Sequence, residues 1–579
     1  MLRAAALRRP TLRMPGRSVA VLASVGILCY LILGPLLMVV FSTFRDTDGS
    51  LPFEAHVPWA LSNYEAVFLR PQTYEVLGTT VIFAVASIVL SFSIGIALAW
   101  VVERTDLPFR NLVFVTVIAS VGVPNIIAGI AWGLLGSPVN GLLNQPIRAV
   151  FGLEPPGPLS VYSLPGMIFV QAITMVPITF LLLSAAFRAM DPAMEDAAST
   201  SGARFMVTLR RITIPLLAPA VVSAMVFQFV TVVESFDIPL LIGLRAGIPV
   251  LSTEIFIQTR PPQALPNYGL AATYSVLLLA LAIGPLLLSG RIIGRSERYA
   301  TITGKGYQPR RYSLGAWKVP ALLAVGVYAL VAVVLPVLSM FWTSLQPFFS
   351  VPSPEAFSRI TFDAYEEILT LPLFHKALLN TLILGVAAGA GTMILGLMVA
   401  WILVRSRSRL RPLLDLLAFM PHAFPGVILG LSILLMYLFL PFPLYGTIWI
   451  IVLALATQEI SLATRLMSGA IAQVQRELEE AAETSGANWF PTMRRVVAPL
   501  VLPALLNGFF LIFLSAIKNL TLALILFAQD SVVLSTVLFT NWDQGHTDRT
   551  GALGMIMMAV TIIAGFITRR LTLLGATRV

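Results

Sequence analysis

About twelve long apolar runs divide this chain of 579 residues, and each is long enough to cross a bilayer. Hydrophobic residue types make up 57% of the sequence and charged residues only 11%, whereas a soluble globular domain carries about 25% charged residues. The runs are continuous rather than alternating, so the sequence predicts membrane-spanning helices and not a β-barrel. Their centres lie near residues 31, 90, 124, 175, 229, 280, 331, 390, 425, 458, 513 and 559.

The positive charges are distributed unevenly between the loops that separate these runs. If the N-terminus is placed inside, most of the 38 Lys and Arg residues fall in inside loops, among them Arg104 and the pair Arg210-Arg211. This positive-inside bias predicts an even number of spans with both termini inside. It also accounts for the net charge of +10, so no nucleic-acid partner is expected.

An internal repeat constrains the fold further. Residues 195–219 return at 479–503, and 13 of the 25 positions are identical. Matches at an offset of 301 residues extend the repeat upstream: Ala99-Trp100 with Ala400-Trp401, Arg104 with Arg405, and Pro124 with Pro425. The chain is therefore predicted to be an all-α membrane protein built from two tandem six-helix repeats in the same orientation. Parallel repeats of this kind are related by an axis along the membrane normal, with a pathway between them.

These features place the boundaries of the parts of the chain. The apolar run that begins at Val19 is longer than a signal-peptide core and lacks an evident cleavage site, so we expect it to remain as the first span. The predicted parts are a basic N-terminus (1–18), a first repeat (19–292) with an inside loop at 187–214, a basic linker (293–318), a second repeat (319–570) with an inside loop at 471–498, and a tail (571–579).

Each copy of the repeated block is a polar, helix-prone segment between apolar runs. Its acidic residues and alanines favour a short helix, and Gly202 or Gly486 lets the chain leave that helix. The block thus predicts a helix–Gly–helix elbow on the same side of the membrane in both halves. A loop helix resting on the membrane would explain one elbow. Two matched elbows indicate a surface that a symmetric partner binds.

The spacing within the block resembles the cytoplasmic loop of binding-protein-dependent (type I) ABC importer permeases. The pattern is acidic-Ala-Ala, three residues, Gly, nine residues, and aliphatic-x-aliphatic-Pro. It stands here as Asp196-Ala197-Ala198, Gly202 and Ile212-Thr213-Ile214-Pro215, and again as Glu480-Ala481-Ala482, Gly486 and Val496-Val497-Ala498-Pro499. The first copy departs from the family in having Asp where Glu is usual, which shortens the reach of the carboxylate.

The resemblance implies a permease of the bacterial inner membrane with no catalytic residues of its own. Each loop would form a coupling helix that sits in a cleft of a cytoplasmic ABC ATPase, and two ATPase copies would bind and hydrolyse ATP-Mg. An external substrate-binding protein would deliver the substrate. The residues that the resemblance assigns to coupling are Glu195, Asp196, Ala197, Ala198, Gly202, Glu479, Glu480, Ala481, Ala482 and Gly486.

Two permease units fused end to end are most similar to the ferric-iron branch of this family. Ferric iron is therefore the substrate that the resemblance implies, with phosphonate, thiamine and polyamine as alternatives. An alternative of a different class is a twelve-helix secondary transporter driven by an ion gradient, in which the matched elbows would have no role.

Five charged residues fall within predicted spans: Glu459 and Arg465 of the tenth span are expected to snorkel or to make helix–helix contacts, and the other three are candidates for a pathway or gate. Glu234 and Asp237 lie in the fifth span and Lys518 lies in the eleventh. A charge at this depth costs several kcal/mol unless it is paired or hydrated, and such residues usually mark a pathway. Because Glu234 and Lys518 are equivalent in the repeat, one hypothesis is an ion pair between them that closes a gate. The other is that each faces a hydrated vestibule.

Some chemistry is absent from the sequence. The chain has no G-x-x-x-x-G-K-[ST] loop, so ATP hydrolysis requires a partner. Its four histidines are scattered without metal-ligand spacing. No metal site and no cofactor are therefore expected in this chain.

Overall fold

The computed structural model describes residues 15–190, 193–261, 264–293, 312–406 and 408–576. This part of the chain is helical, and its only extended pairings are two isolated bridges, Arg45 with Trp59 and Thr105 with Tyr312. The prediction of an all-α fold is confirmed. The predicted N-terminus, linker and tail lie partly outside the described residues, and all the predicted boundaries stay predictions.

Every predicted span centre falls within a helix or a bent helix pair. Nine helices in the described residues are long and apolar enough to cross a bilayer, and four bent pairs also qualify. The unbroken spans of the first half are α1 with α2 (Pro15–Leu28 and Gly34–Thr43), α4 (Pro71–Arg104), α8 (Leu164–Ala189), α11 (Ile214–Val233) and α13 (Tyr268–Ile293). Those of the second half are α14 with α15 (Lys318–Ala329 and Leu335–Ser344), α18 (Pro372–Arg405), α21 (Ile448–Gln473) and α28 (Thr547–Ala576).

The third span of each half is broken at a repeated proline. Helices α5 (Arg110–Ala119) and α6 (Asn125–Leu135) meet at an angle of 93° around Pro124. Helices α19 (Arg411–Phe419) and α20 (Gly426–Phe439) meet at 109° around Pro425. In both halves the residue before the proline is extended, which is the conformation that a following proline ring imposes.

At two other pairs of repeated prolines the helix continues through the proline. A π-helical turn, which relaxes the hydrogen-bond ladder where proline lacks an N–H, precedes the proline in each case. These turns are η1 (Cys29–Leu33) and η8 (Leu330–Val334) before Pro35 and Pro336, and η3 (Leu209–Thr213) and η10 (Met493–Val497) before Pro215 and Pro499.

The structure adds a bent pair that the sequence analysis did not predict. Between the fifth and sixth spans of the first half, η4 (Pro239–Gly243) and α12 (Leu251–Thr259) belong to a pair bent by 83°. The second half has α26 (Thr521–Ile525) and α27 (Leu534–Asp543) at the equivalent place. The second half also bends by 78° between α24 (Ala498–Leu500) and α25 (Leu502–Lys518), whereas the first half runs straight into α11.

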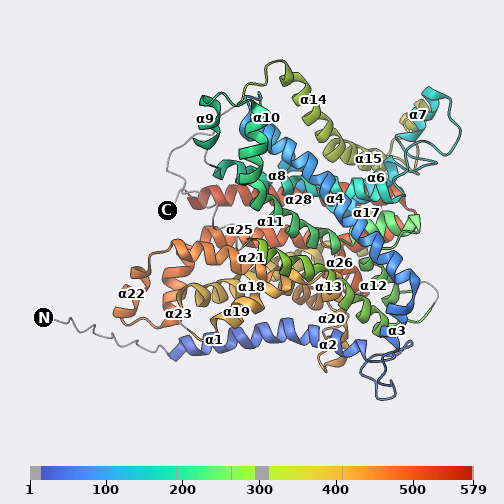
Figure 1. The fold of residues 1–579 in the computed structure, drawn as a ribbon. Coiled ribbons are helices and arrows are strands. Elements are labelled where there is room, and N and C mark those ends of the chain that lie inside the picture. The colour runs from blue at the N-terminus through green and yellow to red at the C-terminus, as the bar shows by residue number, and fades with distance from the viewer. Residues whose placement is uncertain (1–14, 191–192, 262–263, 294–311, 407, 577–579) are drawn as a thin grey trace.

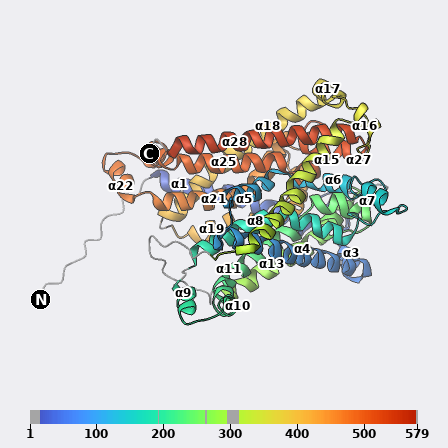
Figure 2. The ribbon, with the colours of Figure 1, turned by 90° about the horizontal axis from the view of Figure 1, so that it is seen from above.

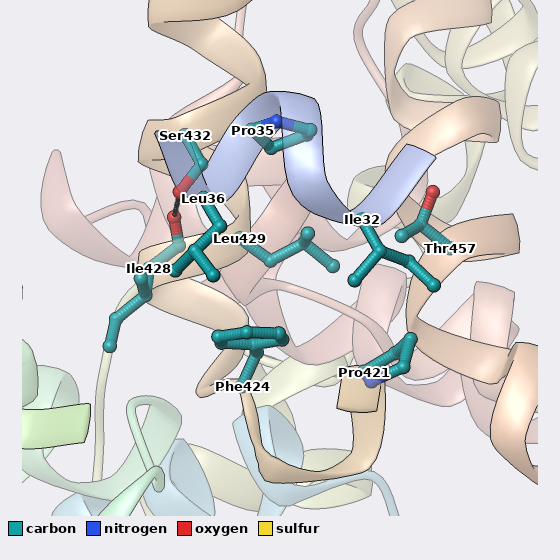
Figure 3. A pocket seen from close by; sticks show the side chains of 9 residues that line it. All are labelled: Ile32, Pro35, Leu36, Pro421, Phe424, Ile428, Leu429, Ser432 and Thr457. Atoms are coloured by element: carbon teal, nitrogen blue, oxygen red, sulfur yellow. Dashed lines mark hydrogen bonds between the residues drawn. The ribbon is translucent and has the colours of Figure 1, made fainter. Parts of the chain in front are cut away.

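The first span of each half packs against the third span of the other half. Helix α2 contacts α20, and α15 contacts α6. A hydrogen bond of 2.8 Å between the hydroxyls of Tyr30 and Tyr437 joins the first of these pairs. Figure 3 shows a small, mainly apolar gap between the first span and α20, which is lined also by residues just before α20 and by Thr457 of α21. The two halves are therefore interleaved rather than simply placed side by side.

The two elbows lie at one end of the molecule. Helix α9 (Ala193–Thr200) and helix α22 (Arg476–Thr484) are both found there, where α1 begins and α28 ends (Figure 1). Helices α7 (Asn144–Phe151) and α17 (Asp363–Thr370) lie at the opposite end in both views (Figures 1 and 2). This arrangement is the one expected when two halves in the same orientation each display their fourth-to-fifth loop on one face.

A repeated glycine sets the close packing of the second and fourth spans. A Cβ added at Gly95 would lie 2.6 Å from Cγ2 of Thr179, and one at the equivalent Gly396 would lie 2.7 Å from Cβ of Ala463 and 3.0 Å from its backbone carbonyl carbon. Real Cβ atoms do not approach other atoms so closely. Small residues at such contacts let membrane helices approach one another closely.

We therefore expect Gly396→Leu to destabilise the protein, because a larger side chain forces α18 away from α21. Overpacking of this kind costs about 1–3 kcal/mol. Thermal unfolding of the purified protein in detergent measures the loss. Gly391→Leu is the matched control, since Gly391 lies exposed in the same helix with no atom within 4 Å of an added Cβ. Equal stability of the two variants would contradict the packing argument.

Candidate functional site

We define the first elbow as residues 193–208 and the second elbow as residues 476–492. Each consists of a helix, α9 or α22, followed by a shorter one, α10 (Phe205–Thr208) or α23 (Trp489–Thr492). The chain turns between them at Gly202, with φ of +78°, and at Gly486, with φ of +85°. Other residue types adopt this left-handed conformation only at a cost of roughly 1–2 kcal/mol. The repeated glycine is therefore a requirement of the turn.

Both elbows present apolar side chains at their surface. Met194 in the first elbow and Leu478 in the second are equivalent, and both are exposed. The equivalent pair Met206 and Phe490 is also exposed, Phe490 by 64%. Ala197 and Ala481 are exposed between them. Apolar groups repeated on two water-facing loops indicate a protein-binding surface rather than scattered exposure.

The two adjacent acidic residues of each elbow point in different directions. Asp196 is partly exposed, and the Glu480 side chain is 55% exposed beside Arg476. Glu195 and Glu479, in contrast, are buried, with exposures of 2% and 5%. The sequence analysis grouped all four as coupling residues, but only the second acid of each pair is placed where a partner could contact it directly.

Glu195 is held inside by an arginine of the second span. Its Oε2 lies 3.3 Å from Nη1 of Arg104, the last residue of α4, which is itself 1% exposed. Arg104 also donates from Nη2 to the backbone oxygen of Phe187 in α8, at 3.2 Å. The other carboxylate oxygen of Glu195 accepts a hydrogen bond of 2.7 Å from the hydroxyl of Thr213.

Glu479 is held in the equivalent way in the second half. Its Oε1 lies 2.8 Å from Nε of Arg405, the last residue of α18, and its Oε2 accepts a hydrogen bond of 2.9 Å from Nε1 of Trp401. Arg405 also donates to the backbone oxygen of Ile471 in α21, at 3.1 Å. Ile471 is the repeat equivalent of Phe187, so the same three-way contact is built twice.

The end of the linker is attached beside Arg104. The amide of Tyr312 donates to the Arg104 carbonyl at 2.8 Å, and Lys318 Nζ lies 2.8 Å from the Asp106 carboxylate. A hydrogen bond from the Leu314 amide, followed by the one from Lys318, lowers the pKa of Asp106 below its usual value. The stabilisation from this lowered pKa is present at neutral pH and is lost as the pH falls through the lowered pKa.

The predicted intramembrane charges lie where the two halves meet. Asp237 accepts a hydrogen bond of 3.4 Å from the hydroxyl of Thr521, its own repeat equivalent. Equivalent positions therefore approach each other across the pseudo-symmetry axis, as the sequence analysis assumed. Lys518, however, donates to the backbone oxygen of Val121 at the break of the third span. Among the described ion pairs there is none between Glu234 and Lys518, and the pairing hypothesis finds no support in this conformation.

Further contacts between the halves involve residues that the sequence analysis did not combine. The ring of Phe227 stacks on His422, with centroids 5.2 Å apart. Arg245 lies 4.4 Å from the ring centroid of Trp542 and donates to its backbone oxygen. No spacing signal could have revealed these contacts, because the partners lie in different halves of the chain.

The duplicated arrangement matches a known family. Residues 91–296 and 392–573, which together exceed half of the chain, each match the family described as "Binding-protein-dependent transport system inner membrane component". The chain belongs to this family. It is a multi-pass protein of the bacterial inner membrane and the permease component of an ABC importer. The alternative of an ion-gradient-driven transporter is thereby set aside.

Several relatives of this permease resemble it over most of its length. The ferric transport system permease protein FbpB of Actinobacillus pleuropneumoniae is 25% identical over 507 residues, which cover 85% of this chain and 72% of the relative. The putative ferric transport system permease protein FbpB 1 of Haemophilus influenzae is 25% identical over 523 residues, covering 89% and 78%. The crystal structure of a bacterial ABC transporter involved in alginate import aligns with 47% of this chain and 92% of that one, at 19% identity and a TM-score of 0.39.

The buried ion pair of the permease generates a stability prediction. We expect Arg104→Met to cost about 3–5 kcal/mol, because it leaves Glu195 charged and unpaired in a buried place. Arg188→Met is the matched control: Arg188 is 56% exposed and pairs with Glu103, which is 11% exposed, between α8 and α4, and pairs that reach solvent contribute about 0–1 kcal/mol. Thermal unfolding in detergent compares the two. Similar shifts in both variants would show that the burial of Arg104 is unimportant.

Proposed function

We propose that this permease couples to two copies of a cytoplasmic ABC ATPase through its two elbows. The observation that carries the proposal is the repeated surface of each elbow: two exposed apolar side chains, two small alanines and an acidic residue around a left-handed glycine. Two equivalent surfaces suit two copies of one partner. Closure of the ATPase pair on ATP-Mg would move the elbows together and turn the pathway outward, and the permease itself would hydrolyse nothing.

A substrate-binding protein is the partner proposed for the opposite end. This role follows from the family, whose description names binding-protein dependence. The contacts of Arg245 with Trp542, and of Arg260 with the backbone oxygens of Ile525 and Phe527, join the two halves near α12 and α27. Breaking these contacts would be part of opening the pathway to the binding protein.

Ferric iron is the substrate that we propose. The support is the relatives named for ferric transport, which match along both halves of the chain. A relative named for 2-aminoethylphosphonate transport matches only 32% of the chain, so phosphonate is a weaker candidate, as are thiamine and polyamine. We place Glu234, Asp237 and Lys518 along the pathway, because they lie at the contact between the halves and carry charge within the spans.

The elbow surface can be tested by introducing charge. We expect Leu478→Glu with Phe490→Glu to weaken ATPase binding by roughly 30-fold or more, since a buried contact of this kind is worth about 2 kcal/mol. The measurement is the amount of ATPase that co-purifies with the permease. Phe348→Glu with Phe362→Glu is the control, since both side chains are exposed outside the elbows. Undiminished ATPase in the elbow variant would refute the proposed docking surface.

Uptake of radiolabelled ferric iron tests the substrate. A strain lacking this chain should lose uptake and regain it with the intact chain. It should not regain uptake with Gly202→Leu and Gly486→Leu, which strain both turns by roughly 1–2 kcal/mol each, or with Lys518→Glu. The Lys518 variant should still co-purify with the ATPase, because the defect lies in the pathway. Unchanged iron uptake in the deletion strain would remove iron and leave the importer proposal to be tested with the other substrates.

A further inference from the structure

In each half, one buried arginine connects three separate elements. Arg104 ends the second span, contacts the end of the fourth span through the Phe187 carbonyl, and pairs with Glu195 of the elbow. Arg405 makes the same three connections through Ile471 and Glu479. Both glutamates are identical between the two copies of the block, whereas the neighbouring exposed acid is Asp196 in one and Glu480 in the other.

The elbow helices have few other ties to these spans. The backbone neighbours of α9 are mainly α10 and η3, and those of α22 are mainly α23 and η10. The chain itself joins α8 to α9 and α21 to α22 over a few residues, whereas the connection from α9 to α4, and from α22 to α18, runs through the arginine and glutamate side chains. A purely apolar contact would hold the helices together with less desolvation cost. Each arginine instead fixes the direction in which the helices are joined, because one nitrogen of its planar guanidinium binds the glutamate and another binds a backbone carbonyl of the fourth span.

We propose that the Arg104–Glu195 and Arg405–Glu479 pairs are the joints that transmit the movement of each elbow to the second span of its own half and hold that span against the end of the fourth. The inference rests on the proposed coupling to an ATPase and assigns these four as positioning residues. The exposed acid would contact the ATPase, and the buried acid would pass the displacement inward. The two neighbouring carboxylates of each elbow thus have different tasks.

The joints of the two halves differ in their third partner. Glu195 also binds Thr213 at the base of the fifth span, so the first joint engages the second, fourth and fifth spans. Glu479 binds Trp401 of the second span, whose ring meets Trp489 of the elbow edge-on at 5.5 Å. Displacement of the first elbow would therefore reach the fifth span directly, whereas that of the second would be directed into α18.

The test measures elbow movement and span movement separately in the permease–ATPase complex. With Cys29→Ser as background, spin labels are placed on the elbows by Ser201→Cys and Ser485→Cys. In a second sample they are placed on the second spans, at exposed and equivalent residues of α4 and α18, by Ser93→Cys and Ile394→Cys. Pulsed electron paramagnetic resonance gives the distance within each pair before and after addition of ATP-Mg and vanadate. No transported substrate is needed.

In the unmodified complex both distances should shorten. Arg104→Lys with Arg405→Lys keeps each buried charge compensated, but a single ammonium group cannot reproduce the fork of contacts made by arginine. In this variant the elbow distance should shorten as before, and the change in the distance between the second spans should fall to less than half. Glu103→Gln is the matched control, because it breaks the ion pair with Arg188 that joins α4 to α8 without involving the elbow, and both distances should then behave as in the unmodified complex.

The outcomes separate the inference from the proposed function. Second spans that follow the elbows normally in the lysine variant would overturn the joint and leave the ATPase coupling intact. If neither distance changed in the unmodified complex, the proposed coupling itself would be wrong. If the lysine variant failed to fold, Glu195→Asp with Glu479→Asp would replace it, since shortening each carboxylate by one methylene slackens the joint while keeping the charges. The same comparison of the two distances then decides.

Discussion

A backbone inside lipid must satisfy its own hydrogen bonds, and prolines therefore govern the shape of this chain. A proline within a span removes a donor, and at the repeated prolines of the first and third spans the structure accommodates this loss in one of two ways. At Pro35 and Pro336 a π-helical turn absorbs the defect, whereas at Pro124 and Pro425 the helix breaks and restarts at a steep angle. Both arrangements are repeated in both halves. The duplicated prolines thus give the two halves the same bends. The breaks also bring backbone carbonyls, such as that of Val121, to the contact between the halves.

The positions of the spans could be predicted from composition, but their shape could not. An apolar run of about 20 residues predicts a membrane-spanning helix. It does not say whether a proline at its centre kinks the helix or divides it, because that depends on the packing of both segments. The added pair Pro239–Gly243 and Leu251–Thr259 was missed for a different reason. Each segment is too short for a span, so hydropathy along the chain merges it with its surroundings.

The elbows could also be predicted from the sequence, because the repeat marks them. The different placement of the two neighbouring acidic residues in each elbow could not. Glu195 and Asp196 are neighbours in sequence, yet successive residues of a helix point about 100° apart, so one is buried and the other is not. Arg104 was interpreted as a topology charge of an inside loop, and its partner Glu195 lies 91 residues away. The signal that could have found the pair is the repeat itself, which keeps the arginine and the buried glutamate unchanged in both halves.

The exchange of first spans has a consequence for biosynthesis. Helix α2 packs against α20, which is synthesised only after the whole first half. Helix α6 likewise packs against α15, which is also synthesised after the first half. The first half therefore cannot complete its packing alone and must remain in the membrane with two unfilled contacts until the second half arrives. Joining the halves in one chain keeps the missing partner close by at high effective concentration. Fusion thus replaces a search between two separate subunits with a folding step inside one molecule.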